Sequence, residues 1–117
     1  MLVAANLAVA FFAPYSNVTA QFAFDPSSPS LLTAFTCLFL HDPENILHLL
    51  GNLVFLASVG PLVETSLGPA KFAAVYLLGG IAGVGAHWIV ATSSGVSVPL
   101  IGASSSIAAC VGYCCVR

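Results

Sequence analysis

Two polar side chains stand one helical turn apart in an otherwise apolar run. His48 and Asn52 are separated by four residues, and segment 45–67 around them is mostly apolar. In an α-helix this spacing places both side chains on one face. Polar groups inside apolar spans are expensive to bury and are functional candidates by default. An imidazole and an amide in this arrangement can donate hydrogen bonds to a ligand or a reacting group.

A second polar cluster, residues 102–106, reads Gly-Ala-Ser-Ser-Ser and precedes another apolar run. A hydroxyl at a helix N-terminus, such as that of Ser104, has free backbone N–H groups beside it that can stabilise an oxyanion. Gly102 allows a neighbouring segment to approach the backbone closely. Taken alone, the three serines are explained better by helix capping and small-residue packing.

The composition places these clusters in a membrane protein. Of the 117 residues, 5% are charged and 59% are hydrophobic, and the mean hydropathy is +1.04. A soluble domain carries about 25% charged residues, so a free-standing soluble domain is excluded. Two basic residues cannot neutralise a run of phosphates, which excludes a nucleic-acid binder. The length allows about three or four membrane spans.

The first 40 residues predict half a span followed by interfacial segments. Segment 2–13 is apolar but too short to cross a bilayer, and we expect a helix whose N-terminal half is missing. Segment 15–30 is predicted to be a loop whose aromatic residues lie at the membrane–water interface. Segment 31–40 is apolar and short, which favours an interfacial or re-entrant segment.

The remainder predicts two complete spans and the start of a third, at residues 45–67, 72–90 and 107–116. Pro43 and Glu44 suit the start of the first span, and Gly68-Pro69 marks the turn after it. Segment 92–99 is predicted to be a loop. The second span carries four glycines that predict a face for close helix approach: Gly79, Gly80, Gly83 and Gly85. The fold class is therefore all-α, a polytopic transmembrane helical bundle.

The charges predict one orientation. Lys71 and Arg117 are separated by an even number of crossings, so both fall on one side, which the positive-inside rule makes cytoplasmic. Asp25, Asp42 and Glu44 fall on the other side. His48, Asn52 and the serine cluster are predicted to lie near that non-cytoplasmic face.

The order of these motifs resembles that of the rhomboid intramembrane serine proteases, over nearly all of the chain. The residues that carry the resemblance are Leu40-His41, then His48-Leu49-Leu50-Gly51-Asn52, then Glu64 and Gly68, then Gly102-Ala103-Ser104. An HxxxN motif followed by a GxS motif on successive membrane helices is specific, whereas either motif alone is weak.

The resemblance implies a role for each matching residue. Ser104 matches the nucleophile that attacks the scissile peptide carbonyl, and His48 and Asn52 match the oxyanion-stabilising pair. His41 and Gly102 are expected to support them. Glu64 matches a structural acid rather than a catalytic one, and segment 22–40 matches a loop embedded in the outer leaflet.

The activity implied is intramembrane proteolysis by acyl transfer. The expected substrates are transmembrane proteins, cleaved near the outer face of the lipid bilayer, which we expect to be the plasma membrane. Neither a cofactor nor a metal is expected.

Two departures from the family pattern bear on activity. Many rhomboids have glycine after the serine, where this chain has Ser105. The family's general base, a histidine on its sixth helix, would lie beyond residue 117. We therefore expect residues 1–117 to be one rhomboid-like membrane domain, truncated after the start of the serine-bearing helix. It would hold about four of six helices and would be inactive as it stands.

Two other functions stay open. A non-catalytic rhomboid-like protein that binds transmembrane clients predicts a complete gene without that histidine. A small transporter subunit predicts polar residues along the whole length of several spans. His87 and Trp88 are interpreted as an interfacial anchor pair. No disulfide and no metal site is assigned to the four cysteines, Cys37, Cys110, Cys114 and Cys115.

Overall fold

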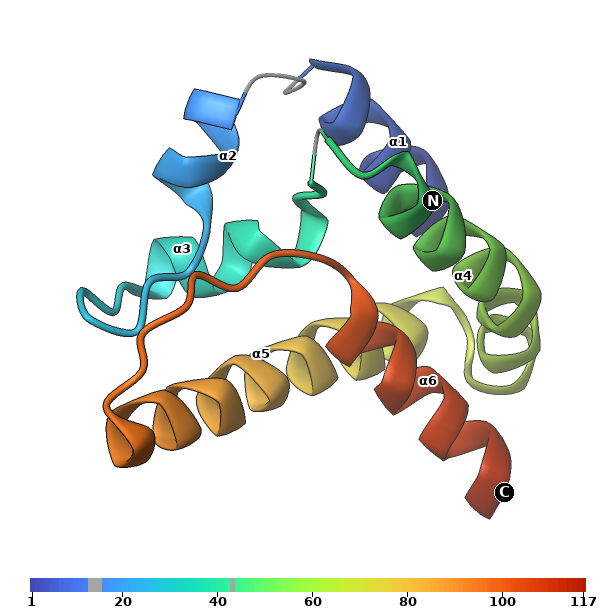
Figure 1. Cartoon of the computed structure of the whole chain (residues 1–117). Coiled ribbons are helices and arrows are strands. Elements are labelled where there is room, and N and C mark those ends of the chain that lie inside the picture. Colours follow the sequence, from blue (N-terminus) through green and yellow to red (C-terminus); the bar gives the residue numbers. More distant parts are fainter. Residues whose placement is uncertain (13–15, 43) are drawn as a thin grey trace.

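A computed structural model describes residues 1–12, 16–42 and 44–117 (Figure 1). Pro43, the last residue of the predicted segment 2–13 and the first residue of segment 15–30 lie outside these ranges. The described residues contain helices and one isolated β-bridge but no strand, which confirms the all-α prediction. The helices are α1 (Leu2–Phe12), α2 (Ser16–Phe22), α3 (Leu31–Thr36), the 3-10 helix η1 (Cys37–Phe39), α4 (Ile46–Leu67), α5 (Pro69–Ser94) and α6 (Ser104–Val116).

Helices α4 and α5 are long and apolar enough to cross a membrane. They contain 22 and 26 residues, which at about 1.5 Å per residue exceeds the thickness of a hydrocarbon core of about 30 Å. Gly68 joins them in a conformation with φ of +82°, and Pro69 occupies the first turn of α5. The two spans were predicted at these places, although α5 extends further at both ends. Part of the expected 92–99 loop is therefore helical.

Glycines on α5 let helix α6 pack very closely against it. A Cβ atom at Gly79 would overlap Ala109, and one at Gly83 would overlap Ser105. At Gly80 it would meet both Ser106 and Leu38 of η1. The prediction of a close-approach face is correct for these three positions. It was wrong for Gly85, where a Cβ would meet nothing within 4 Å.

Helix α6 begins at Ser104, three residues before the predicted span. The first backbone hydrogen bond of this helix runs from the Ile107 N–H to the Ala103 carbonyl, at 2.9 Å. Ser106 is fully buried. Ser104, Ser105 and Ser106 therefore form the first turn of the helix, and the small side chains of Ser105 and Ser106 pack against glycines of α5.

The segment before α4 differs from the prediction at one place. Ser16–Phe22 forms helix α2, whereas its Ser, Asn and Thr content predicted a loop. Thr19 and Ala23, four residues apart, are both buried, so packing against the rest of the protein overrides the weak local preference. The short apolar segment after it forms α3 and η1. Leu31 at the start of α3 is 92% exposed, while Cys37 of η1 is fully buried.

A buried polar contact fastens α1 to the bundle. The Asn6 amide donates to the Tyr76 hydroxyl of α5 at 3.1 Å, and that hydroxyl donates to the Leu38 carbonyl of η1 at 3.3 Å. Asn6 and Tyr76 are almost completely buried. Because a buried polar group without a partner is costly, these bonds specify how the three elements meet.

The close α5–α6 approach yields a matched test. Alanine at either Gly79 or Gly85 gains helix propensity of about 1 kcal/mol, but only Gly79→Ala overpacks the interface. We expect Gly79→Ala to lower the free energy of unfolding by about 1–3 kcal/mol and Gly85→Ala to leave it unchanged or raise it. Denaturation of the detergent-solubilised protein measures both, and equal effects would contradict this packing.

Candidate active site

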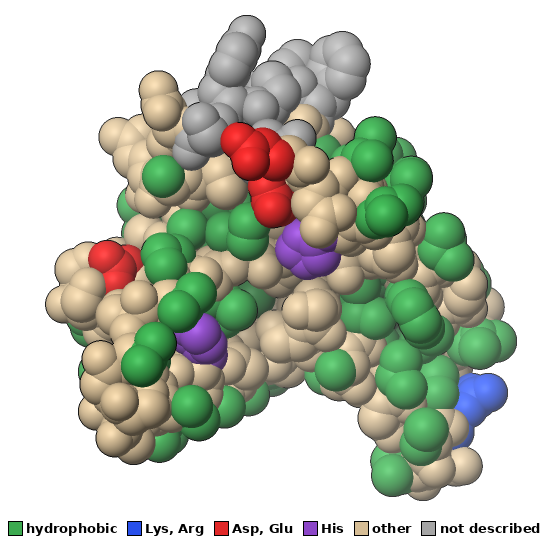
Figure 2. All heavy atoms as spheres, in the orientation of Figure 1, with side chains coloured by type: hydrophobic (Ala, Val, Ile, Leu, Met, Phe, Trp, Pro, Cys, Tyr) green, Lys and Arg blue, Asp and Glu red, His purple; other side chains and the backbone are tan. Residues whose placement is uncertain are grey.

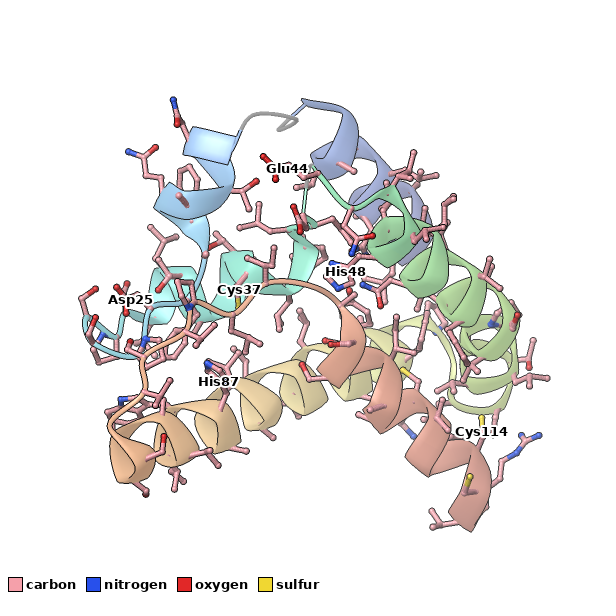
Figure 3. All side chains as sticks on the ribbon, viewed as in Figure 1. Asp25, Cys37, Glu44, His48, His87 and Cys114 are labelled. Atoms are coloured by element: carbon pink, nitrogen blue, oxygen red, sulfur yellow. The ribbon has the colours of Figure 1, made fainter. Side chains whose placement is uncertain are left out.

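The start of helix α4 is capped in a way that fixes His48. The Asn45 side chain accepts a hydrogen bond from the His48 N–H at 3.2 Å, as an N-cap residue does. The Asp42 carboxylate accepts from the Glu44 N–H at 2.9 Å and shapes the turn before the cap. His48 therefore lies in the first turn of α4 (Figure 3). Asn52 follows one turn later on the same face.

The side chains of His48 and Asn52 both lie against the backbone of Gly102. A Cβ atom built on Gly102 would be 2.9 Å from Cε1 and Nε2 of His48 and 3.6 Å from Nδ2 of Asn52. Gly102 also has φ of +108°, a conformation that other residues rarely adopt. Glycine is thus required at this position both for space and for backbone conformation. The structure brings together the two sequence motifs, HxxxN and GxS.

Ser104 follows Gly102 by two residues and is the first residue of α6. Its side chain is exposed, while its neighbour Ala103 is 1% exposed. No side chain caps this helix. The backbone N–H groups of the first turn precede the first helical hydrogen bond and have no partner within the helix. Ser104 therefore combines an accessible hydroxyl with N–H groups that can bind an anion.

Ser105 and Ser106 face helix α5 instead. Ser105 lies against Gly83, and its hydroxyl is 3.5 Å from the Gly80 carbonyl oxygen. Ser106 is completely buried against Gly80. Of the three serines in the cluster, Ser104 is the exposed one.

Some of the buried polar atoms without partners lie near this point. Within the described part of the chain, Nδ2 of Asn52 and both ring nitrogens of His41 are buried without a hydrogen-bond partner. The His41 side chain is 6% exposed, and its ring centroid lies 5.7 Å from that of His48. Unsatisfied buried donors are rare in proteins and call for an explanation. Asn52 and His41 are residues that the sequence singled out, and further unpartnered atoms belong to Asn6, Thr19 and Ser106.

Four hydrogen bonds hold the loop that leads to Ser104. Phe24 and Leu100 exchange two backbone bonds, of 3.0 and 2.8 Å. The Ser97 hydroxyl donates to the Asp25 carboxylate at 3.1 Å, and the Gly102 N–H donates to the Cys37 carbonyl at 2.8 Å. The segment around α3 and η1 therefore determines where the loop passes (Figure 3).

His87 also fastens this loop, and it does so from helix α5. Its Nε2 lies 2.8 Å from the Val98 carbonyl oxygen, and Figure 3 shows the ring directed towards the loop. Trp88 beside it is 43% exposed. The predicted interfacial pair thus includes one residue, His87, with a specific partner in the loop.

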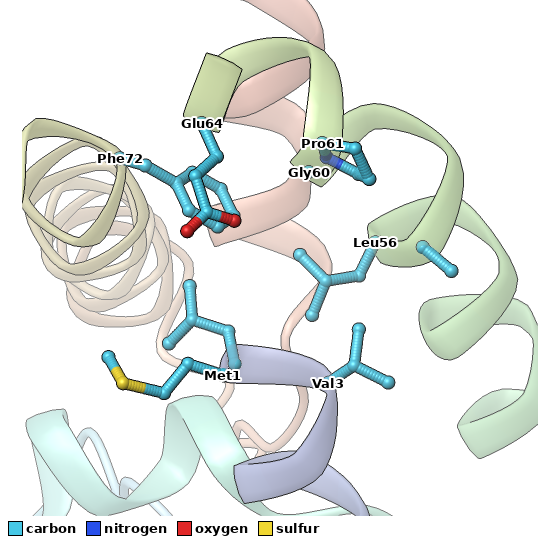
Figure 4. A pocket seen from close by; sticks show the side chains of 9 residues that line it. Met1, Val3, Leu56, Gly60, Pro61, Glu64 and Phe72 are labelled. Carbon is cyan, nitrogen blue, oxygen red and sulfur yellow. The ribbon is translucent and has the colours of Figure 1, made fainter. Parts of the chain in front are cut away.

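Glu64 lies apart from this cluster. It lines a cavity of about 240 Å³ between the start of α1 and helix α4, together with Leu56, Gly60 and Phe72 (Figure 4). Its surroundings are mostly apolar packing groups. The structure therefore does not place Glu64 with His48, Asn52 and Ser104.

Sequence reasoning missed the residues that position the serine loop. Phe24 and Cys37 act through backbone atoms, so their residue types carry no signal. Asp25 could be noticed only as an isolated charge in an apolar chain. Hydrogen bonds donated by Ser27 lower the pKa of the Asp25 carboxyl group, with a smaller contribution from Ser97. Asp25 is therefore an ionised acceptor at neutral pH.

Comparison with known proteins agrees with this arrangement. The family model of the Rhomboid domain matches residues 28–117, which include both motifs and helices α3 to α6. No curated protein and no solved structure gives a match. The chain belongs to the rhomboid family, and it is a membrane protein.

The contact at Gly102 can be tested directly. Gly102→Ala would force a methyl group against the His48 imidazole and impose an unfavourable φ, so we expect a loss of about 1–3 kcal/mol of stability. Gly112→Ala on α6 is the matched control, because a Cβ there meets nothing within 4 Å. Chemical denaturation of both variants measures the difference. An unaffected Gly102→Ala variant would contradict the contact.

Burial of His41 predicts a dependence of stability on pH. Desolvation, followed by the nearby His48, lowers the pKa of His41 below its ordinary value of 6.5. The unfolded chain then binds a proton that the folded chain does not, so the free energy of unfolding falls as pH drops below about 6.5. Denaturation midpoints between pH 8 and pH 5 measure this decline.

His41→Gln should flatten that pH profile, whereas His87→Gln should retain the decline. If His41→Gln loses stability with falling pH as steeply as the parent protein, His41 does not cause the pH dependence.

Proposed function

We propose that this protein is an intramembrane serine endopeptidase that cleaves transmembrane proteins by acyl transfer. The observation that carries the proposal is the contact of His48 and Asn52 with Gly102, two residues before Ser104. Because of this contact, two candidate hydrogen-bond donors lie near a candidate nucleophile at a helix N-terminus. Membership of the rhomboid family supports the same reaction.

In the proposed mechanism, Ser104 Oγ attacks the carbonyl carbon of the scissile peptide bond. The carbonyl oxygen becomes an oxyanion, which accepts hydrogen bonds from His48, Asn52 and the Ser104 N–H. Donors that are already fixed in place stabilise such charge strongly, because they need little rearrangement during the reaction. The unpartnered Nδ2 of Asn52 is consistent with a donor held ready for a substrate.

The reaction then passes through an ester between Ser104 and the substrate. Collapse of the tetrahedral intermediate breaks the C–N bond, and the leaving amine takes the proton that Ser104 gave up. Water then hydrolyses the ester and frees the serine. A serine hydroxyl needs a general base for the first step. The family resemblance implies a histidine beyond residue 117 for that role. His87 is instead engaged with Val98.

The charge pattern supports a site near the non-cytoplasmic face. Helix α4 runs from His48 towards Glu64, and Lys71 follows at the start of α5. If the end of the bundle that carries Lys71 is cytoplasmic, the site at Ser104 faces the outer leaflet. We propose that substrates enter from the bilayer of the plasma membrane and are cut near its outer surface.

The decisive assay uses the protein expressed from its complete gene and reconstituted in liposomes with a transmembrane substrate. Ser104→Ala should abolish cleavage. His48→Ala and Asn52→Ala should each lower kcat by about 10²–10³, as is typical for loss of an oxyanion donor. Gel analysis of the cleavage products measures all three.

Ser105→Ala is the matched control, because this neighbouring serine packs against α5 and should retain cleavage. Undiminished cleavage by Ser104→Ala would remove that serine from the mechanism. Substrate binding without any cleavage by the complete protein would favour the alternative, a non-catalytic rhomboid protein that binds transmembrane clients.

A further inference from the structure

An open groove lies between helix α3 and helix α5, away from the candidate active site. It has a volume of about 300 Å³, at the lower end of the range of about 300–1,000 Å³ for small-molecule sites. Ala34 and Val84 are buried and form its floor. Leu31, Ile81 and Trp88 are exposed and form its rims. Because α5 is long and apolar enough to cross a membrane, the groove opens towards lipid.

Gly85 deepens this groove. It lines the groove from α5, and a Cβ atom there would meet nothing within 4 Å. Gly79 and Gly83 of the same helix instead let α6 approach closely. Glycine within a helix is less favourable than alanine, and no close contact inside the protein explains it at position 85. The missing side chain leaves a notch that an external apolar group can enter, such as an unbranched acyl chain.

A carboxylate lies at one end of the groove. Phe24 and Pro29 both line the groove and flank a turn over residues 25–28, which the Ser28 N–H closes by donating to the Asp25 carbonyl at 3.1 Å. The Cα atom of Asp25 is therefore about 3.8 Å from that of Phe24. The hydrogen bonds that Ser27 and Ser97 donate to the Asp25 side chain all reach Oδ1. Oδ2 can thus accept from an external donor.

The end of helix α5 adds negative potential at the same place. The loop that follows Ser94 meets Asp25 through the Ser97 hydroxyl at 3.1 Å, and Figure 3 shows Asp25 beside this loop. Carbonyl groups at a helix C-terminus carry partial negative charge and favour a cation nearby. Lys71 lies at the opposite end of α5 and Arg117 follows α6.

The view of the whole surface agrees with this separation of charge. In Figure 2, acidic side chains lie towards the top and the left of the face shown, and a basic side chain lies at the lower right. The negative end of the groove therefore lacks a basic side chain of residues 1–117 beside it, and it complements a cation supplied from outside.

We propose that this groove binds one phosphatidylethanolamine molecule, with an acyl chain between α3 and α5 and its ammonium group hydrogen-bonded to Asp25. A primary ammonium carries three N–H donors, whereas a choline headgroup carries none and the net negative charge of phosphatidylglycerol is repelled by Asp25. Trp88 lies about 9 Å before the end of α5 at 1.5 Å per residue. At this depth its indole N–H can donate to the phosphate or ester oxygens of the same lipid. The lipid site is independent of the proposed proteolysis.

Quenching of Trp88 fluorescence measures which lipid occupies the groove. The full-length protein is reconstituted in vesicles of phosphatidylcholine with brominated acyl chains, which quench tryptophan on contact. Unbrominated phosphatidylethanolamine, phosphatidylcholine or phosphatidylglycerol is then mixed in, and the recovery of fluorescence gives their relative affinities. Trp88 is the single tryptophan of residues 1–117, and Trp88→Phe supplies the background signal.

We expect phosphatidylethanolamine to displace the brominated lipid about fivefold more effectively than unbrominated phosphatidylcholine, which is the factor that one charge interaction at a membrane surface provides. Phosphatidylglycerol should be less effective than both, because its headgroup brings a second negative charge to the Asp25 end of the groove.

Two pairs of variants locate the preference. Asp25→Asn keeps an oxygen that accepts from Ser27 but removes the charge, so the three lipids should become nearly equal. Glu44→Gln removes an acid that does not line this groove and should retain the preference. Gly85→Leu fills the notch and should abolish the preference. Ala86→Leu adds the same side chain at an exposed position of α5 outside the groove and should leave the preference unchanged.

Several results would overturn the lipid site. Equal displacement by all three lipids in the parent protein would do so, as would a preference that survives Gly85→Leu. A preference lost equally in Glu44→Gln would reduce the effect to general surface charge. Trp88 fluorescence that brominated lipid does not quench would show that a protein segment, such as a second copy of the chain, covers the groove instead. Ser104→Ala, which tests the protease, should retain the lipid preference.

Discussion

The arrangement depends on one steric constraint, which is the passage of the Gly102 backbone against the side chains of His48 and Asn52. No other residue fits there, because the position has both a positive φ and a Cβ direction filled by the imidazole. The N-cap of α4 fixes the position of His48 in this contact. The hydrogen bonds that hold residues 97–102 to segment 24–25, η1 and His87 position the loop that carries Gly102. Ser104 takes its position from both, since it follows Gly102 by two residues at the start of α6.

Buried polar atoms without partners occur at several places among the described residues. Between α1 and α5, the Asn6 amide nitrogen donates to the Tyr76 hydroxyl, whereas the Asn6 side-chain oxygen has no partner. His41, Asn52, Thr19 and Ser106 also retain buried side-chain atoms without partners, and of these His41 and Asn52 lie at the candidate site. Unpaired polar groups are costly in a low-dielectric interior. Those of Asn52 and His41 are consistent with a site that binds a polar substrate.

Much of this fold could be predicted because its signals are local. Apolar length determines α4 and α5, and four-residue spacing places His48 and Asn52 on one face. Gly79 and Gly83 predict the close contact with α6, but Gly85 has the same residue type and faces open space. Helix α2 was missed because packing of Thr19 and Ala23 outweighs its polar composition. The bridge between Phe24 and Leu100 joins backbone atoms of distant segments, so the residue types at these positions do not predict it. Whether Ser104, His48 and Asn52 catalyse remains a prediction.

The most direct measurement of the central claim is covalent labelling of the full-length protein in membranes with a fluorophosphonate, which reacts with activated serines. Mass spectrometry of the labelled protein locates the adduct. A nucleophile positioned as proposed predicts one adduct on Ser104, formed much more slowly in Asn52→Ala and blocked by an excess of a transmembrane substrate. An unlabelled Ser104 in a folded protein that carries the complete chain would contradict the account. So would an adduct on Ser105.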